Sequence, residues 1–149
     1  MKRRTLLQVA LAGALGVHLV ASAALPVIEV YKNPSCGCCT GWVKHLEQNG
    51  FAVKVHEVAN TSDYRAKFGI PDALGSCHTA TVQGYAIEGH VPASEIKRLL
   101  AENRKVKGLA VPSMPLGAPG MEGNRSDPYD VLLVKTDGSY STYRHYNGK

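Results

Sequence analysis

The stretch NPSCGCCTGW, residues 33–42, carries three of the chain's four cysteines within four positions. Cys36 and Cys39 have the Cys-x-x-Cys spacing of thiol–disulfide exchange sites, in which one thiolate attacks and the other resolves. Thiol–disulfide exchange by this pair gives Cys38 no role. Three thiolates on one turn can instead surround a soft metal ion, which would use every cysteine of the stretch. The motif therefore leaves a redox pair and a metal site as alternatives.

Further candidate ligands lie downstream of the cysteine motif. Cys77 and His78 add a fourth sulfur and an imidazole, and His90 precedes a predicted helix. Met114 and Met121 are the two methionines after the initiator, and both lie in one Gly/Pro-rich stretch. Thiolate, thioether and imidazole ligands together favour Cu(I) over hard cations. The composition of these candidates thus favours copper.

Other uses of the cysteines stay open. Zinc is one, although the usual paired Cys-x-x-Cys or Cys-and-His spacing is absent. An iron–sulfur cluster is another, and two structural disulfides in a small exported domain are a third. Three cysteines crowded into positions 36–39 have poor geometry for forming two structural disulfides. We predict His45, His56 and His145 to be surface residues.

The first 23 residues have the three parts of a secretory signal peptide. A basic start at 2–4 precedes an apolar run at 6–20, and the small residues Ala21, Ser22 and Ala23 follow. The run is shorter than the about 20 residues of a membrane span, so we predict cleavage after Ala23 and no membrane attachment afterwards. The two arginines at its start also resemble a twin-arginine signal.

Removal of this segment changes the charge balance. It holds three of the 17 Lys and Arg and none of the 12 Asp and Glu, so the net charge falls from +5 to +2. The remaining chain has no basic run, which argues against nucleic-acid binding.

Residues 24–149 are predicted to form a single α/β domain. The patterns predict, in order, a strand at 27–31, a helix at about 36–48, a strand at 51–58, a short helix at 61–68, a hairpin at 79–83 and 85–88, a helix from Pro92, a Gly/Pro/Met-rich loop at 108–128 and a C-terminal β-hairpin at 129–146. This order is typical of a thioredoxin-like fold. In that fold the segment entering the third strand lies against the turn after the first, so Cys77 and His78 are expected near 36–39.

Three segments together resemble the CopG-type copper-resistance proteins, small exported proteins of Gram-negative bacteria. They are YKNPSCGCCTGWVKHLEQNGF, SCHTATVQGYAIEGHVPASEIKRLL and GLAVPSMPLGAPGME. The resemblance covers about 28–146. It implies a thioredoxin-like fold and a periplasmic location, with copper held by Cys36, Cys38, Cys39 and Cys77, beside His78 and the two methionines.

The resemblance also bears on activity and partners. It allows a multinuclear, cysteine-bridged copper centre that changes redox state, and hence a copper oxidoreductase. The partners implied are copper ions and other periplasmic copper-handling proteins. Two alternatives stay open beside it: a metal-free thiol–disulfide oxidoreductase using Cys36 and Cys39, and a binding module stapled by two disulfides.

Overall fold

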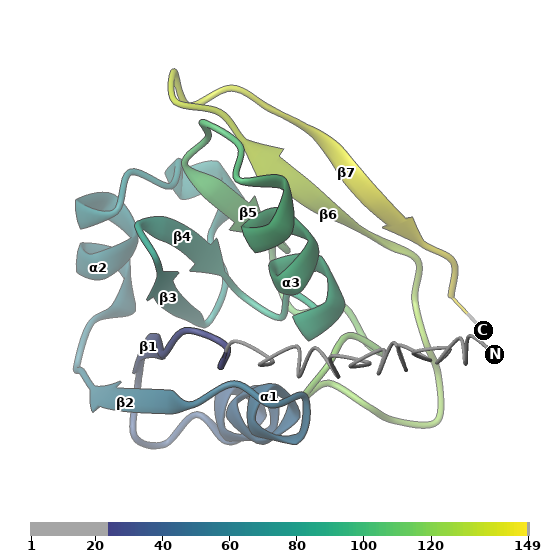
Figure 1. Ribbon diagram of the computed structural model, residues 1–149. Coiled ribbons are helices and arrows are strands. Elements are labelled where there is room, and N and C mark those ends of the chain that lie inside the picture. Colours follow the sequence, from purple (N-terminus) through teal and green to yellow (C-terminus); the bar gives the residue numbers. More distant parts are fainter. Residues whose placement is uncertain (1–23, 149) are drawn as a thin grey trace, which may run out of the picture.

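The computed structural model describes residues 24–148, so the predicted signal peptide lies outside the described part of the chain. Its elements in chain order (Figure 1) are β1 (Ile28–Lys32), α1 (Gly37–Gln48), β2 (Val53–Glu57), α2 (Thr61–Lys67), the 3-10 helix η1 (Asp72–Leu74), β3 (His78–Val82), β4 (Tyr85–Glu88), α3 (Ala93–Glu102), β5 (Gly108–Ala110), β6 (Tyr129–Val134) and β7 (Tyr140–Tyr146). Within 24–148, no helix is long and apolar enough to cross a membrane.

The strands form one seven-stranded sheet in the order β2-β1-β3-β4-β5-β6-β7. β1 and β2 are parallel and joined by α1, whereas β3 runs antiparallel to β1 and β4 antiparallel to β3. This strand–helix–strand unit, followed by a hairpin and α3, confirms the predicted α/β fold and is consistent with a thioredoxin-like core. The predicted C-terminal hairpin, β6 and β7, is also present and extends the same sheet through β5.

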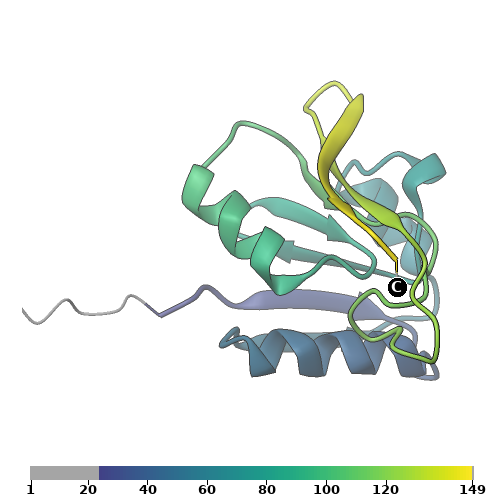
Figure 2. The same cartoon turned by 90° about the vertical axis from the view of Figure 1, so that its right-hand side faces the viewer.

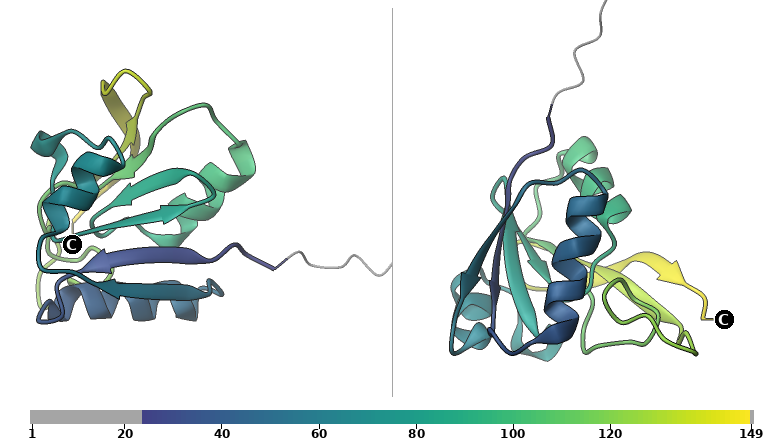
Figure 3. Two further views of the ribbon diagram at one scale, coloured as in Figure 1. Left: turned by 90° about the vertical axis from the view of Figure 1, so that its left-hand side faces the viewer. Right: turned by 90° about the horizontal axis from the view of Figure 1, so that it is seen from below.

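Helices cover both faces of the sheet, with α1 and α3 on one face and α2 on the other (Figure 3). The larger core cluster lies under α1 and α3, where Trp42, Leu46, Ile96 and Leu99 are fully buried. Trp42 and Leu46 lie four residues apart, a spacing that places both side chains on one face of α1. A smaller cluster, which includes Ile70 and Leu74 beside the α2 region, covers the opposite face.

One strand differs from the sequence prediction. Residues 108–110, predicted as the start of a long loop, form β5 between β4 and β6, parallel to the first and antiparallel to the second. All three residues are buried, so the strand shows no alternation of apolar and polar side chains, and three residues are too few for a periodic signal.

The chain from 111 to 128 contains no helix or strand. It leaves β5 and passes the N-terminal end of α1 before it enters β6 (Figure 2). The loop rich in Gly, Pro and Met is thereby brought against the helix turn that carries the cysteines.

Candidate metal centre

The cysteine turn joins the end of β1 to α1. The Asn33 side-chain oxygen accepts hydrogen bonds from the Ser35 backbone N–H (3.0 Å) and hydroxyl (2.6 Å). The Asn33 backbone carbonyl accepts one from the Cys36 N–H (3.1 Å). Cys36 is the N-cap residue of α1, and Cys38 and Cys39 follow in the first helical turn. This local turn places all three sulfurs at one end of the helix.

Cys77 completes a group of four sulfurs. It directly precedes β3, which lies beside β1 in the sheet and pairs His78 with Lys32 at the end of β1. Its Sγ lies 3.8 Å from that of Cys38, which in turn lies 3.5 Å from Cys36 Sγ. All four sulfurs lie within 4.8 Å of one another. The structure thus places Cys77 where the predicted fold put it.

Two of the four sulfurs are bonded to each other. Cys36 and Cys39 form a disulfide, whereas Cys38 and Cys77 are free, half-buried thiols. A module stapled by two disulfides would leave no free thiol, so this alternative does not describe the structure. Cys39 is fully buried and Cys36 is partly exposed, so an incoming group can reach Cys36 first.

Two histidines flank Cys77 and form a second group with it. Its Sγ lies 3.3 Å from His78 Nδ1 and 3.1 Å from His90 Nε2, and the two imidazole rings meet edge to face at 5.0 Å. Both histidines are fully buried. His78 is also packed against the Trp42 ring, with 4.4 Å between the ring centroids. Cys77 therefore belongs to a sulfur group and to a Cys-His-His group, each close enough together to hold a metal ion.

The orientation of His90 is fixed by the Gly/Pro/Met loop. Its Nδ1 lies 2.8 Å from the carbonyl oxygen of Pro119, which can only accept a hydrogen bond, so Nδ1 carries the proton. Nε2 then directs its lone pair toward Cys77. A histidine whose far nitrogen donates to a backbone carbonyl is the usual arrangement of a metal-binding imidazole.

Burial sets the ionisation of these groups. It lowers the pKa of His78 to about 3, with the nearby His90 adding to the effect, and it lowers the pKa of His90. It also raises the pKa of the Cys77 thiol to about 12, an effect that the neighbouring Cys38 increases. At neutral pH the site therefore offers neutral imidazoles and a protonated Cys77 thiol. Nε2 of His78 is buried with no hydrogen-bond partner among the described residues.

The two methionines lie on the loop that packs against the cysteine turn. A Cβ added to Gly120 would lie 2.6 Å from the carbonyl oxygen of Cys38, so the loop backbone touches the first turn of α1. Met114 is half exposed and Met121 is partly buried. Their role as ligands stays a prediction.

The other histidines have structural or surface positions. His45, predicted to lie at the surface, is half-buried, and its Nε2 accepts a hydrogen bond of 3.1 Å from the Ala93 N–H at the start of α3. His56 bonds Glu29 and His145 bonds Asp130 on partly exposed strand faces, as expected for surface residues.

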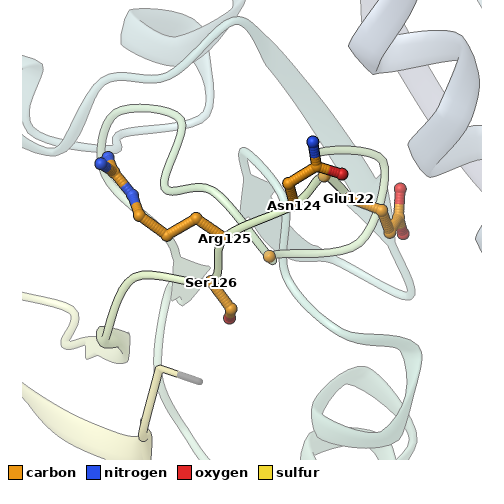
Figure 4. A pocket seen from close by; sticks show the side chains of 6 residues that line it. Glu122, Asn124, Arg125 and Ser126 are labelled. Carbon is orange, nitrogen blue, oxygen red and sulfur yellow. The ribbon is translucent and has the colours of Figure 1, made fainter.

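A surface hollow of about 330 Å³ also lies in the loop (Figure 4). It is lined by Gly117, Glu122, Gly123, Asn124, Arg125 and Ser126. None of the candidate ligands lines it. The hollow is thus separate from the candidate metal centre.

Sequence reasoning missed two groups that support the centre. One is the Pro119 carbonyl, which no side-chain pattern marks. The other is Glu88, a fully buried carboxylate whose only sequence signal is its place at the end of an otherwise apolar strand.

The chain is similar to known proteins over most of its length. The family model described as "Protein of unknown function, DUF411" matches residues 74–121. No curated protein matches the chain. Two solved structures titled copper resistance protein copG, Form 2 and Form 1, each match at 44% identity and a TM-score of 0.78. The matches cover 82% and 83% of this chain and 98% and 99% of theirs. The chain belongs to the CopG family of copper-resistance proteins.

Proposed function

We propose that this protein binds copper in the periplasm and contributes to copper resistance. The observation that carries the proposal is the convergence of four cysteine sulfurs within 4.8 Å, with two buried imidazoles beside one of them. The printed names of the similar structures, copper resistance proteins, support it. The segment 1–23, read as an export signal, accounts for the periplasmic location, and 24–149 would form the single mature domain.

The ligand set explains the choice of metal. Thiolates are soft ligands that stabilise Cu(I), and imidazoles suit both Cu(I) and Cu(II). Cys36, Cys38, Cys39 and Cys77 would supply the sulfurs, and His78 and His90 the nitrogens. Met114 and Met121 would add thioethers from the loop. Because the four sulfurs lie within 4.8 Å of one another, a thiolate could bridge two copper ions, and the site could then hold more than one.

A redox step follows from the Cys36–Cys39 disulfide. All four sulfurs can bind copper only after an external dithiol has reduced this bond by thiol–disulfide exchange, in which the dithiol is itself oxidised to a disulfide. In the oxidising direction the Cys36 and Cys39 thiolates would form the S–S bond again and transfer one electron to each of two Cu(II) ions, giving two Cu(I). We include this copper oxidoreductase step in the proposal, with other periplasmic copper-handling proteins as the source or destination of the metal.

The test is reconstitution of the reduced protein with Cu(I) under anaerobic conditions, followed by measurement of copper and thiols per chain. Cys38→Ser and Cys77→Ser should each bind markedly less copper than the parent. Thr40→Ser, an exposed position in the same helical turn, is the matched control and should bind as the parent does. A Cys38→Ser variant with parental copper content would overturn the proposed site.

A second candidate function is metal-free thiol–disulfide exchange, which the observed Cys36–Cys39 disulfide favours. A substrate thiolate would attack Cys36 Sγ, the more exposed sulfur, and Cys39 would leave as the thiolate. This function needs neither Cys38 nor Cys77. Unchanged disulfide reductase activity in Cys38→Ser, together with no copper bound by the parent, would favour exchange over copper binding.

A further inference from the structure

Glu88 forms hydrogen bonds with the residues on both sides of the Cys77–His78 pair. It ends β4 and is fully buried. One carboxylate oxygen accepts a hydrogen bond of 2.7 Å from the Ser76 N–H, and the other accepts one of 2.5 Å from the Thr79 hydroxyl. Because Ser76 precedes Cys77 and Thr79 follows His78, a single side chain spans the two candidate ligands.

Glu88 is also close in sequence to His90, the third residue of the Cys-His-His group. Thr79 pairs with Glu88 in the β3–β4 ladder, and the Gly89 N–H donates to the His78 carbonyl at 3.0 Å. His90 follows immediately. The end of this hairpin therefore carries Cys77, His78 and His90, and Glu88 links its two strands through a side chain as well as through the backbone.

Ser76, whose N–H donates to Glu88, also contacts the Gly/Pro/Met loop. The Ser76 hydroxyl donates to the Ser113 carbonyl at 2.5 Å, and the Ser113 N–H donates to the Gly75 carbonyl at 3.0 Å. Ser113 precedes Met114. The segment that Glu88 holds is thus also the one that anchors the start of the loop.

A buried carboxylate is costly unless it is paired or hydrogen-bonded. Here the Arg65 guanidinium Nε lies 3.8 Å from Glu88 Oε1, and two donors bond the carboxylate. These bonds are directed at the residues that flank the candidate ligands. Groups that orient metal ligands in this way commonly change metal affinity about 10- to 100-fold when they are removed.

We propose that Glu88 is a positioning residue of the copper site, which fixes the directions of Cys77 and His78 through its bonds to Ser76 and Thr79. The inference rests on the proposed copper-binding function. Glu88 would not bind copper itself.

The experiment compares Glu88→Ala and Glu88→Gln with the parent and with Glu57→Ala, an exposed strand-end glutamate that serves as control. Glu88→Ala should release Cu(I) to a competing chelator about 10- to 100-fold more readily. It should also lose nitrogen ligands in X-ray absorption spectra. Glu88→Gln should stay within about threefold of the parent, because its amide can accept from Ser76 and donate to Thr79. Parental copper release and nitrogen content in folded Glu88→Ala would overturn the proposal.

Two further measurements keep the result interpretable. If Glu88→Ala does not fold, Thr79→Val removes one bond at nearly constant shape, and parental copper release in that variant overturns the proposal. Alkylation of Cys77 in metal-free protein, followed by peptide mass spectrometry, tests positioning without copper and should be several-fold faster in Glu88→Ala than in Glu57→Ala. If Cys77 is alkylated several-fold faster in Glu88→Ala than in Glu57→Ala but the parent binds no copper, the proposed function is overturned and the positioning role is supported.

Discussion

At the scale of single residues, Cys77 is the point at which the two candidate ligand groups meet. Its sulfur lies 3.8 Å from that of Cys38 and 3.1 to 3.3 Å from nitrogens of His90 and His78. A ligand shared in this way can bridge two metal positions of different character, one rich in sulfur and one containing nitrogen. Loss of this one sulfur would therefore weaken both groups.

The ionisation of the site predicts which groups release protons when copper binds. Cys77 is a protonated thiol at pH 7 because its pKa is raised to about 12, whereas His78, with a pKa lowered to about 3, is already neutral. Metal binding to a thiol displaces its proton. Titration of reduced protein with Cu(I) in weak buffer at pH 7 should therefore release at least one proton fewer per chain in Cys77→Ser than in the parent.

The same argument gives the direction of the pH dependence. As pH falls, protons compete for each thiolate, so each thiol that must ionise weakens Cu(I) binding about tenfold per pH unit. His78 should not contribute to this slope between pH 5 and 8. Equal proton release by the parent and Cys77→Ser would show that Cys77 does not bind the metal.

At the scale of elements, His45 links α1 to the start of α3. Its Nε2 accepts the Ala93 N–H at 3.1 Å, so it acts as an N-cap acceptor supplied by another helix. We expect His45→Ala to lower the free energy of unfolding by about 1 kcal/mol, the usual cost of a lost cap. Chemical denaturation of the metal-free protein at pH 8, where the imidazole is neutral, measures this cost.

The His45 contact also predicts a dependence of stability on pH. Burial lowers the pKa of His45 in the folded protein, so below the unfolded value of about 6.5 the unfolded chain takes up the proton first. Stability should therefore be complete above pH 6.5 and fall as pH decreases. His45→Gln, which keeps an acceptor without a titrating group, should show a shallower fall between pH 6.5 and 5. Because His78 and His90 titrate in both proteins, identical slopes would contradict this role.

The contact between the loop and α1 depends on Gly120. A Cβ there would lie 2.6 Å from both the Cys38 carbonyl oxygen and the Trp42 nitrogen, and the residue has φ of +85°. Gly120→Ala should cost about 2 to 4 kcal/mol through crowding and backbone strain. Gly123→Ala, in the same loop with no atom within 4 Å, should change stability by less than about 0.5 kcal/mol. Thermal unfolding of both variants tests the difference.

Elements with a clear period were predictable from the sequence. In α1, Cys39, Trp42, Val43 and Leu46 have the i, i+3, i+4, i+7 spacing of one apolar helix face, and the structure buries all four. The β3–β4 hairpin, α3 and the C-terminal hairpin follow from similar patterns. β5 could not be recognised, because its three residues are held by pairing with β4 and β6 rather than by a local signal.

The candidate site was predictable only where ligand type and topology coincide. Cys77 and His78 could be placed beside the cysteine turn because β3 neighbours β1 in the expected fold. The contacts of Pro119 with His90, of His45 with Ala93 and of Glu88 with Ser76 depend on how loops and helix ends pack in three dimensions. No spacing in the sequence encodes them.

At the scale of the whole molecule, the candidate ligands come from segments that the chain separates widely. The cysteine turn follows β1, Cys77 precedes β3, and His90 precedes α3. A metal ion bound by all three would connect the neighbouring strands β1 and β3 and the turn before α3. In the unfolded chain these ligands are no longer held together, although the three cysteines at 36–39 remain neighbours in sequence.

Copper should therefore stabilise the folded protein only through the distant ligands. A ligand stabilises the native state by its preference for that state over the unfolded one, and each tenfold preference adds about 1.4 kcal/mol. In the parent, Cu(I) should raise the melting temperature of reduced protein. In Cys77→Ser, Cu(I) bound at 36–39 meets similar ligands in folded and unfolded chains, so most of this rise should disappear even where some copper still binds. A Cys77→Ser variant that is stabilised by Cu(I) as strongly as the parent would mean that copper does not cross-link these segments.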